Sequence, residues 1–334
     1  MNNIKKIAVV ILNWNGAKLL EQFLPSVLAF SNEATVYVAD NASSDDSVEV
    51  IKNQFPTVKI IQNTENYGFA KGYNEALQFV EEEFYALVNS DIEVTENWLV
   101  PILSLFETQP QTAIIQPKIL DFKRKTHFEY AGAAGGFLDK FGYPFCRGRI
   151  FDFVEEDKLQ YEDEADIFWA TGACFFIRKS VFRILNGFDE AFFAHQEEID
   201  LCWRAFNLGY NTKYTSKSIV YHVGGATLNE GNPKKTFLNF RNSLLMLTKN
   251  LPKNQLFFII FIRLFLDGLA GIQFVLKGKF KHCWAIIKAH FAFYSLANQF
   301  YKKRNNIQNN NYYKTKSIVY SYFVKNGKVF ADLF

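Results

Sequence analysis

A regular alternation of apolar, β-rich runs with helix-like stretches is the feature that most constrains the fold. The apolar runs at 7–12, 35–39 and 84–88 are each followed by a longer stretch in which hydrophobic residues recur at helical spacing. Strands joined by helices in this way form a parallel sheet, since each connection must cross over the sheet. We therefore predict an α/β fold with a mostly parallel central sheet.

The chain is long enough for one large domain and an appendage. Its 334 residues are 49% hydrophobic and 21% charged, which is typical of a globular protein. Glycines and aromatic residues crowd 121–165, where we expect irregular loops and short strands. We predict a domain over 1–250, whose halves are 1–120 and 121–250, and a separate tail over 251–334.

Cysteine usage and the N-terminus bear on the compartment. Four scattered cysteines form no Cys-x-x-Cys pair, so neither a disulfide framework nor a zinc knuckle is expected. The first apolar run, Ile7 to Leu12, is too short for the core of a signal peptide. We therefore expect a cytoplasmic protein.

Polar side chains stand where three of the predicted strands end. Asn13 and Asn15 follow the first strand, Asp40 and Asn41 the second, and Asn89-Ser90-Asp91 the fourth. Ligands of open parallel sheets bind beyond the carboxyl ends of the strands, because loops and helix N-termini converge there. Asp91 suits Mg²⁺ or Mn²⁺ on a pyrophosphate, and Asp40 suits a base or ribose. The alternative for both aspartates is a helix cap or turn.

A glycine-containing loop, Asn66 to Asn74, precedes a predicted helix. Its backbone amides near Asn66, Gly68 and Lys71 could approach a nucleotide closely. The chain has no Gly-Lys-Ser/Thr loop there and no Gly-x-Gly-x-x-Gly after the first strand. These absences argue against an ATPase and a dinucleotide-dependent dehydrogenase.

A group of acids opens a predicted helix that Gly209 could end. Glu197, Glu198 and Asp200 fall in its first turn, within HQEEIDLCWRAF. One carboxylate could take the proton from an attacking hydroxyl, or the acids could only complement the helix dipole. His222, at the end of a strand-like run, is either a metal ligand or a histidine satisfied within a loop.

Six segments occur in an order that resembles the family-2 glycosyltransferases, close to the rhamnosyltransferase-like branch of bacterial surface-polysaccharide enzymes. They are VVILNWNG, VADNASSDDS, NYGFAKGYNEAL, LVNSDIEV, TGACFFIRKSVF and GFDEAFFAHQEEIDLCWRAFNLGY, and the resemblance runs from about 5 to 245. It implies a Rossmann-like glycosyltransferase-A fold with a nucleotide-binding half, 1–120, and an acceptor half, 121–250. It also implies a hexosyltransferase-type enzyme that inverts the anomeric centre in a single displacement.

The resemblance assigns roles to individual residues. Asp91 matches the last carboxylate of the metal signature, whose first position holds Asn89, and His222 could be a further ligand. Glu198 matches the catalytic base, with Glu197 or Asp200 as alternatives if the helix is rotated. The nucleotide side then comprises Asn13, Asn15, Asp40, Asn41, Asn66, Gly68, Lys71 and Asn89, and the acceptor side Trp169, Gly172 and Ala173.

The implied ligands follow from the same resemblance. The donor is expected to be dTDP-rhamnose or a UDP-sugar, held with Mg²⁺ or Mn²⁺, and the acceptor a glycan or lipid-linked glycan of the cell surface. Two rivals stay open: a sugar-phosphate nucleotidyltransferase, which releases pyrophosphate, and a non-catalytic membrane-bound partner with the same fold.

The tail differs in character from the rest of the chain. Residues 251–334 hold 13 of the 37 basic residues but only 2 of the 34 acidic ones. Gln255 to Leu276 could span a bilayer at ~1.5 Å per residue, but Arg263 and Asp267 near its middle would each cost ~2.5–3.5 kcal/mol there.

We therefore expect an amphipathic helix lying in an anionic membrane surface at the inner face of the cell membrane. A spanning helix and a docked core helix are the alternatives. Nucleic acid is not an expected partner, because the tail matches no readout module.

Overall fold

A mixed central sheet organises the molecule in the computed structural model, which describes residues 5–224 and 231–334. Its strand order is β11-β13-β6-β12-β4-β1-β2-β3, and β5 also pairs with β13. The strands are β1 (Ile7–Asn13), β2 (Ala34–Asp40), β3 (Lys59–Gln62), β4 (Phe84–Asn89), β5 (Ile92–Val94), β6 (Thr112–Asp121), β11 (Glu164–Ile167), β12 (Cys174–Arg178) and β13 (Asn211–His222).

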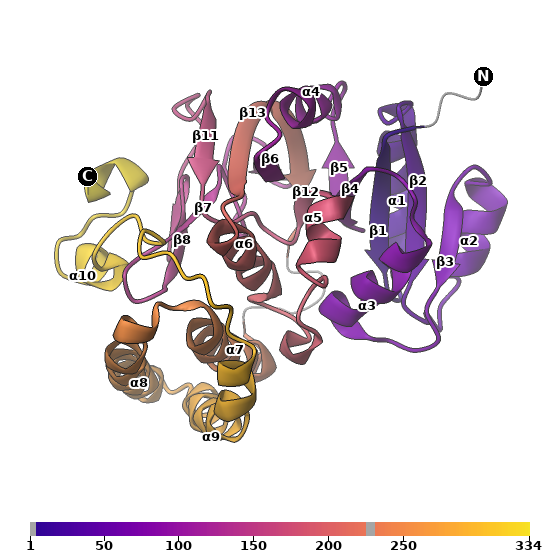
Figure 1. Ribbon diagram of the computed structural model, residues 1–334. Helices are drawn as coiled ribbons and strands as arrows, with labels where there is room; N and C mark the ends of the chain where they lie inside the picture. The colour runs from indigo at the N-terminus through magenta and orange to yellow at the C-terminus, as the bar shows by residue number, and fades with distance from the viewer. Residues whose placement is uncertain (1–4, 225–230) are drawn as a thin grey trace.

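The first half of the sheet has the predicted parallel arrangement. Strands β3, β2, β1 and β4 are parallel neighbours, and helices connect them (Figure 1). Beyond β4 the sheet is mixed: β12 runs antiparallel to both β4 and β6, whereas β6 and β13 are again parallel. The predicted α/β class is therefore confirmed, and the antiparallel strands belong to the second half of the chain.

Helices cover both faces of this sheet. The helices of this part of the chain are α1 (Ala17–Ala29), α2 (Ser47–Gln54), α3 (Gly68–Ala76), α4 (Val100–Thr108), α5 (Lys179–Ile184) and α6 (Glu197–Asn207). Successive residues of β1 enter different cores: Val9 lies in a cluster with Leu20 of α1, and Val10 in one with Tyr73 of α3. This two-sided burial explains why the strand is apolar at every position.

A small second sheet occupies the glycine-rich segment. Strands β7 (Gly136–Leu138), β8 (Pro144–Cys146), β9 (Arg149–Ile150) and β10 (Phe153–Val154) form an antiparallel ribbon, in line with the short strands expected there. A Cβ atom on Gly136 would lie 2.1 Å from the Trp169 ring, so only glycine lets this sheet pack against the indole.

The C-terminal helices pack on the same core. They are α7 (Pro233–Asn250), α8 (Lys253–Leu276), α9 (Phe280–Lys302) and α10 (Ile318–Phe323). Figure 1 shows α7, α8 and α9 gathered below the small sheet and beside α6. Ile259, Phe293 and Phe300 belong to the hydrophobic cluster that also contains residues of β1 and α3. Residues before and after position 251 therefore belong to one hydrophobic cluster.

Candidate active site

The ends of β1 and β2 form one buried polar group. Asn13 and Asp40 stand opposite each other in the strand register, and Asn13 Nδ2 donates to Asp40 Oδ1 at 3.1 Å. The other oxygen of Asp40 accepts from the backbone N–H of Ser43 at 3.0 Å. Asp40 does not cap α2, because α2 begins at Ser47, whose backbone N–H is bonded by Asp45. The cap interpretation of Asp40 is therefore wrong.

Asn41 joins this strand end to the glycine-containing loop. Its Nδ2 donates to Gly68 O at 2.9 Å and to Asn66 Oδ1 at 3.3 Å. Gly68, with a φ of +71°, opens α3, and a Cβ atom there would clash with the Phe193 ring. The structure thus brings together the polar residues predicted at two strand ends and in this loop.

Two further predicted nucleotide-side residues line the same edge. Asn15 adopts a left-handed φ of 51°, and its Oδ1 accepts from Ser44 N at 2.7 Å. Lys71 places its ammonium 3.9 Å from the centre of the Tyr67 ring. A cation held beside the start of a helix is suited to a phosphate group.

Asp91 meets His222 at the junction of β5 and β13. Asp91 Oδ1 lies 3.1 Å from His222 Nε2, and Glu129 Oε1 lies 3.1 Å from His222 Nδ1. The antiparallel pairing of His222 with Ile92 brings the two strand ends together. All three side chains are buried. Asp91 is therefore not a helix cap, and His222 is not an isolated loop histidine.

The negative charges around His222 favour a positive charge at this position. Burial would lower the pKa of the His222 imidazole, but Glu129 and Asp91 outweigh it and raise the pKa to about 10. An imidazole with this pKa is protonated at neutral pH, so His222 must lose a proton before its nitrogen can join the Asp91 oxygen as a ligand of Mg²⁺ or Mn²⁺. No three-ligand metal cluster occurs among residues 5–224 and 231–334, so the remaining ligands would come from phosphate and water.

The predicted acceptor-side residues fall in two places. Ala173 O accepts from Asn89 N at 2.9 Å, and a Cβ atom on Gly172 would touch the Phe69 ring, so both lie beside the nucleotide side. Trp169 instead packs on the small sheet and donates its indole N–H to Phe137 O at 2.9 Å. Its side chain supports the small sheet and does not join the cluster around Asp91.

Glu197 and Glu198 open α6 with carboxylates that lack complete pairing. One buried Oε2 on each has no hydrogen-bond partner within the described chain. Burial raises the pKa of Glu198 to about 7, and burial together with the neighbouring Glu198 charge raises the pKa of Glu197 well above its ordinary value. A carboxylate with a pKa near neutrality is suited to general-base catalysis.

Asp200 has a different environment. Its oxygens accept from Lys249 Nζ at 2.9 Å, Arg204 Nε at 2.8 Å and Asn250 Nδ2 at 2.7 Å, and its side chain is fully buried. Burial opposes ionisation, but the charges of Lys249 and Arg204 prevail and lower the pKa of Asp200. Both carboxylate oxygens of Asp200 are therefore occupied by these hydrogen bonds.

The segment before α6 is strained. Phe193, His195 and Gln196 have φ values of 64°, 70° and 76°, a region that costs about 1–3 kcal/mol for a residue other than glycine. Such strain persists only where surrounding contacts impose it, and it is common at functional sites.

Buried contacts link β6 with the segment before β12, and that segment with α6. Gln116 Nε2 donates to Gly132 O at 3.0 Å, and Gln116 Oε1 accepts from Thr171 N at 2.9 Å. The backbone N–H of Ala170 then contacts Cys202 Sγ of α6 at 3.5 Å. In Figure 1, α6 lies directly below β6 and β12.

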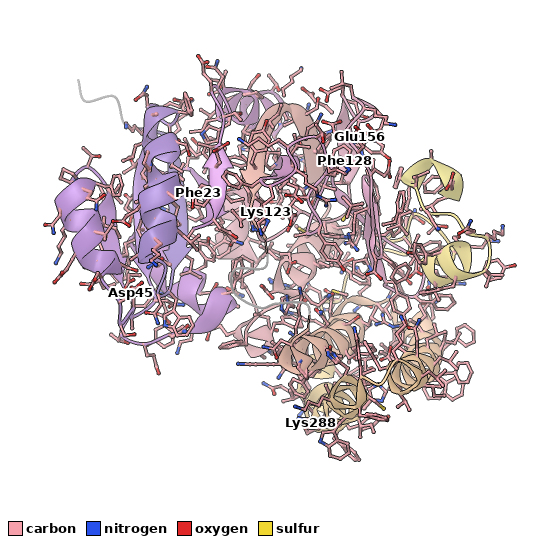
Figure 2. All side chains as sticks on the ribbon, turned by 180° about the vertical axis from the view of Figure 1, so that it is seen from behind. Phe23, Asp45, Lys123, Phe128, Glu156 and Lys288 are labelled. Atoms are coloured by element: carbon pink, nitrogen blue, oxygen red, sulfur yellow. The ribbon has the colours of Figure 1, made fainter. Side chains whose placement is uncertain are left out.

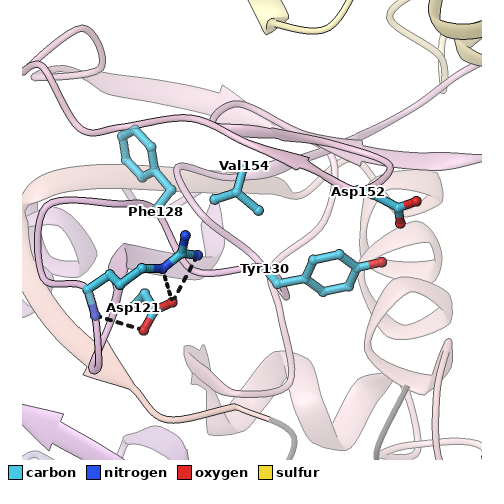
Figure 3. Close-up of a pocket in the computed structure, with 6 residues that line it drawn as sticks. Asp121, Phe128, Tyr130, Asp152 and Val154 are labelled. Atoms are coloured by element: carbon cyan, nitrogen blue, oxygen red, sulfur yellow. Dashed lines mark hydrogen bonds and ion pairs between the residues drawn. The ribbon is translucent and has the colours of Figure 1, made fainter. Parts of the chain in front are cut away.

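A hollow of about 290 Å³ lies beside the end of β6 (Figure 3). Asp121, at its edge, pairs with His222 across the β6–β13 register and binds the Arg124 guanidinium at 3.3 Å. The other lining residues are Phe128, Tyr130, Asp152 and Val154. From behind, Figure 2 shows Phe23 of α1 near the loop that carries Lys123, and the Phe23 and Phe122 rings are in edge contact at 5.2 Å.

Sequence reasoning missed Glu129 and this hollow. Glu129 lies in the irregular segment, where no strand end or motif marks it. The only available signal was an acid followed by an aromatic residue and glycines, which is too common to single out a site.

Comparison with known proteins identifies the family. Residues 8–185 match the model of glycosyl transferase family 2. An N-acetylglucosaminyl-diphospho-decaprenol L-rhamnosyltransferase of Mycobacterium tuberculosis is 23% identical over 235 residues, covering 65% of this chain and 75% of that protein. Rhamnosyltransferase WbbL of Escherichia coli is 26% identical over 163 residues, covering 47% and 61%.

Solved structures share the fold. GalNAc-T7 with UDP, GalNAc and Mn²⁺ has a TM-score of 0.59 at 15% identity, over 76% of this chain and 49% of that one. S. aureus TarS 1-349 in complex with UDP-GlcNAc has a TM-score of 0.57 at 16% identity, over 90% and 84%. The chain thus belongs to glycosyl transferase family 2, in which it resembles the rhamnosyltransferases, and it is a glycosyltransferase of glycan biosynthesis.

Proposed function

We propose that the enzyme transfers a sugar from a nucleoside diphosphate to an acceptor hydroxyl with inversion, and that Glu198 is the base. The observation that carries this proposal is the Glu198 carboxylate, which combines a pKa of about 7 with a buried oxygen that has no partner in the described chain. Asp200 is a poorer candidate because its oxygens are bound by Lys249, Arg204 and Asn250.

The proposed sugar transfer is a single displacement. Glu198 takes the proton of the acceptor hydroxyl, and the hydroxyl oxygen forms a bond to the anomeric carbon. The bond from that carbon to the diphosphate oxygen breaks on the opposite face, so the configuration inverts and the nucleoside diphosphate departs with the electron pair. Glu197 lies beside the base, and burial together with the Glu198 charge raises its pKa, which favours its protonated form.

The edge formed by β1, β2 and α3 holds the nucleotide in this proposal. Asp40 and Asn41 face the nucleoside, and Lys71, near the start of α3, faces the diphosphate. Asn13 holds Asp40 in place through the 3.1 Å hydrogen bond. Asn13, Asn15, Asn66 and Asn89 complete the edge.

Asp91 and His222 would hold Mg²⁺ or Mn²⁺, which supplies positive charge to the leaving diphosphate when bound. Glu129 orients the His222 ring from its Nδ1 side, as outer carboxylates do for many metal-binding histidines. The Mn²⁺ present in the structures of GalNAc-T7 and of a Pyrobaculum calidifontis mannosyltransferase supports a divalent ion.

The relatives favour particular substrates. Two of them are named as rhamnosyltransferases, and one of these acts on a lipid-linked diphosphate sugar according to its name. We propose dTDP-rhamnose or a UDP-sugar as donor and a glycan or lipid-linked glycan of the cell surface as acceptor.

The C-terminal helices are proposed to lie on the inner face of the cell membrane. By length and composition α8 could cross a membrane, but Ile259, Arg263, Asp267 and Gly271 form a buried face. Arg263 donates to Phe141 O at 3.0 Å and to Ser243 Oγ at 2.8 Å. If α8 crossed the membrane, these hydrogen bonds would be lost.

The opposite face of these helices is apolar and basic. Its exposed aromatic side chains are Phe257, Phe258, Phe261, Phe265, Phe280, Trp284, Phe291 and Tyr294. Lys277, Lys279, Lys281 and Lys288 are exposed beside them, and Figure 2 shows Lys288 on the outer edge. An aromatic face bordered by lysines suits an anionic lipid surface.

A thermal-shift panel of UDP-, dTDP- and GDP-sugars, with and without Mn²⁺, tests the proposed function. The donor should raise the melting temperature more with Mn²⁺ than without it, because it binds only the folded state. Turnover must then release nucleoside diphosphate. Release of pyrophosphate would indicate a nucleotidyltransferase, and binding without any product over a broad acceptor panel would indicate a non-catalytic protein.

A further inference from the structure

The strained segment that precedes the proposed base is held by a buried amide of α7. Asn242 of α7 is fully buried, and its Nδ2 lies 2.9, 2.9 and 2.8 Å from the carbonyl oxygens of Phe192, Ala194 and His195, so its two hydrogens are shared among three acceptors. These three carbonyls belong to the turn that leads directly into Glu197. One side chain therefore contacts three peptide groups of the turn just before the catalytic acids.

Arg241 sets the orientation of this amide. Its Nε donates to Asn242 Oδ1 at 2.8 Å, so the oxygen faces the guanidinium and the NH₂ group faces the turn. Its Nη2 also reaches the carbonyls of Ala191 and Phe192 at 3.2 Å. An asparagine amide can be turned by half a revolution at little cost when it is alone, and this arginine removes that freedom.

Two lysines of α7 also contact this segment. Lys234 places its ammonium 5.3 Å from the centre of the Phe193 ring. Two turns beyond Asn242, on the same face, Lys249 bridges Asp189 and Asp200 at 2.9 Å each. The segment is thus bound at its start, at its turn and within the first turn of α6.

Three left-handed residues within this short segment need such support. Phe193, His195 and Gln196 are not glycines. Without the hydrogen bonds from Asn242 their backbone would relax toward ordinary φ values. Relaxation at Gln196 would rotate the first turn of α6 and displace the Glu198 carboxylate.

We infer that Asn242 is a positioning residue for the base: it holds the left-handed turn at 193–196 and thereby aims Glu198 at the acceptor hydroxyl. Arg241 acts through Asn242. This inference rests on the proposed role of Glu198 and adds to it a second residue, far along the chain, on which the chemical step depends.

Asn242→Ala tests the inference against a matched control, Asn250→Ala. Asn250 is a buried amide on the same helix, bonded to Asp200 and Met246 O, but it does not touch the turn. We expect Asn242→Ala to lower kcat by ~10- to 100-fold, the size expected for a misplacement of about 1 Å, with the KM for donor within about twofold of wild type. Asn250→Ala should lower the melting temperature but keep kcat per folded molecule within about threefold.

Arg241→Lys serves as a milder variant if Asn242→Ala does not accumulate as folded protein. It keeps the charge but loses the planar Nε–H that orients the amide, so kcat should fall while donor binding persists. Equal losses of kcat in the Asn242 and Asn250 variants, or full kcat in both Asn242→Ala and Arg241→Lys, would overturn the inference. Full activity of Glu198→Gln would instead refute the proposed base, so the two failures are distinguishable.

Discussion

His222 Nε2 lies 3.1 Å from Asp91 Oδ1, although Asp91 lies in the turn before β5 and His222 ends β13, far along the chain. The pairing of β5 with β13 creates this contact, and Glu129 holds the other ring nitrogen. At this distance the Asp91 carboxylate and the His222 imidazole are hydrogen-bonded to each other. The contact brings together the two side chains that would hold the proposed metal ion.

Asp91→Asn and His222→Gln should each weaken Mn²⁺ binding by about 10-fold or more. Each removes a donor from a site that offers few protein ligands, and the loss is felt most when the nucleotide is present. Mn²⁺ titration followed by electron paramagnetic resonance, with UDP or dTDP present, measures the affinity. Asp166→Asn, an exposed acid on β11, is the control; unchanged affinity in both site variants would contradict the metal assignment.

Activity should rise with pH and reach half its limit near pH 7. Glu198 must be deprotonated to act as base, and burial raises its pKa to about 7, so the protonated, inactive form dominates below that value. A profile of kcat/KM for the acceptor between pH 5 and 9 checks this, and a flat profile down to about pH 5 would argue against Glu198.

The raised pKa of Glu198 also makes the stability of the fold depend on pH. A carboxyl group whose pKa is raised in the folded state stabilises the fold while protonated and loses that contribution as pH rises through about 7. Glu198→Gln stays neutral at all pH values. Its melting temperature should therefore exceed that of wild type at pH 8 and match it near pH 5, as differential scanning calorimetry can determine.

Asp200→Asn should destabilise the protein by about 3–5 kcal/mol, because it leaves Lys249 and Arg204 buried without their shared anion. Urea unfolding measures the change. The pKa of Asp200 is lowered in the folded state, so its stabilisation is present above the ordinary carboxyl range and lost as pH falls below it. The gap between the wild type and Asp200→Asn should accordingly narrow in acid, and a loss below about 1 kcal/mol at pH 7 would show that the network is unimportant.

The helices α8 and α9 should bind vesicles that contain anionic lipid. Full-length protein is expected to float with vesicles of mixed phosphatidylglycerol and phosphatidylcholine, and less with phosphatidylcholine alone, because lysines supply about 1 kcal/mol each near an anionic surface. The double change Phe261→Ser and Phe265→Ser should lower flotation several-fold. Phe79→Ser removes an equally exposed ring (68% exposed) outside these helices, and equal flotation of all three proteins would contradict the membrane proposal.

Much of the fold follows from local pattern. The parallel strands β1, β2 and β4 and the helix from Glu197 to Asn207, with Gly209 at a φ of 85° just beyond it, are where periodicity predicts them. Helix α3 ends at Ala76, earlier than its amphipathic pattern, because Leu77–Phe79 tighten into a 3₁₀ turn. Strand β12 reads like any buried strand, and nothing local reveals that it runs antiparallel.

Some residues of the candidate site could likewise be predicted from the sequence, and others could not. Asn13, Asp40 and Asp91 could be found because strand ends converge at one edge of a sheet. Glu129 and Asn242 act on residues distant in sequence, His222 and the turn before α6, so their roles emerge only when the chain is folded. Likewise, one face of α8 is buried although its sequence fits a spanning helix, because Arg263 finds partners on other elements.

The central claim is that Glu198 removes the acceptor proton, and Glu198→Gln tests it most directly. The amide keeps the shape of the side chain but is not a base, so the variant should bind the donor with wild-type affinity while its single-turnover transfer rate falls by at least ~10²-fold. Transfer at the wild-type rate, with donor binding unchanged, would contradict the account.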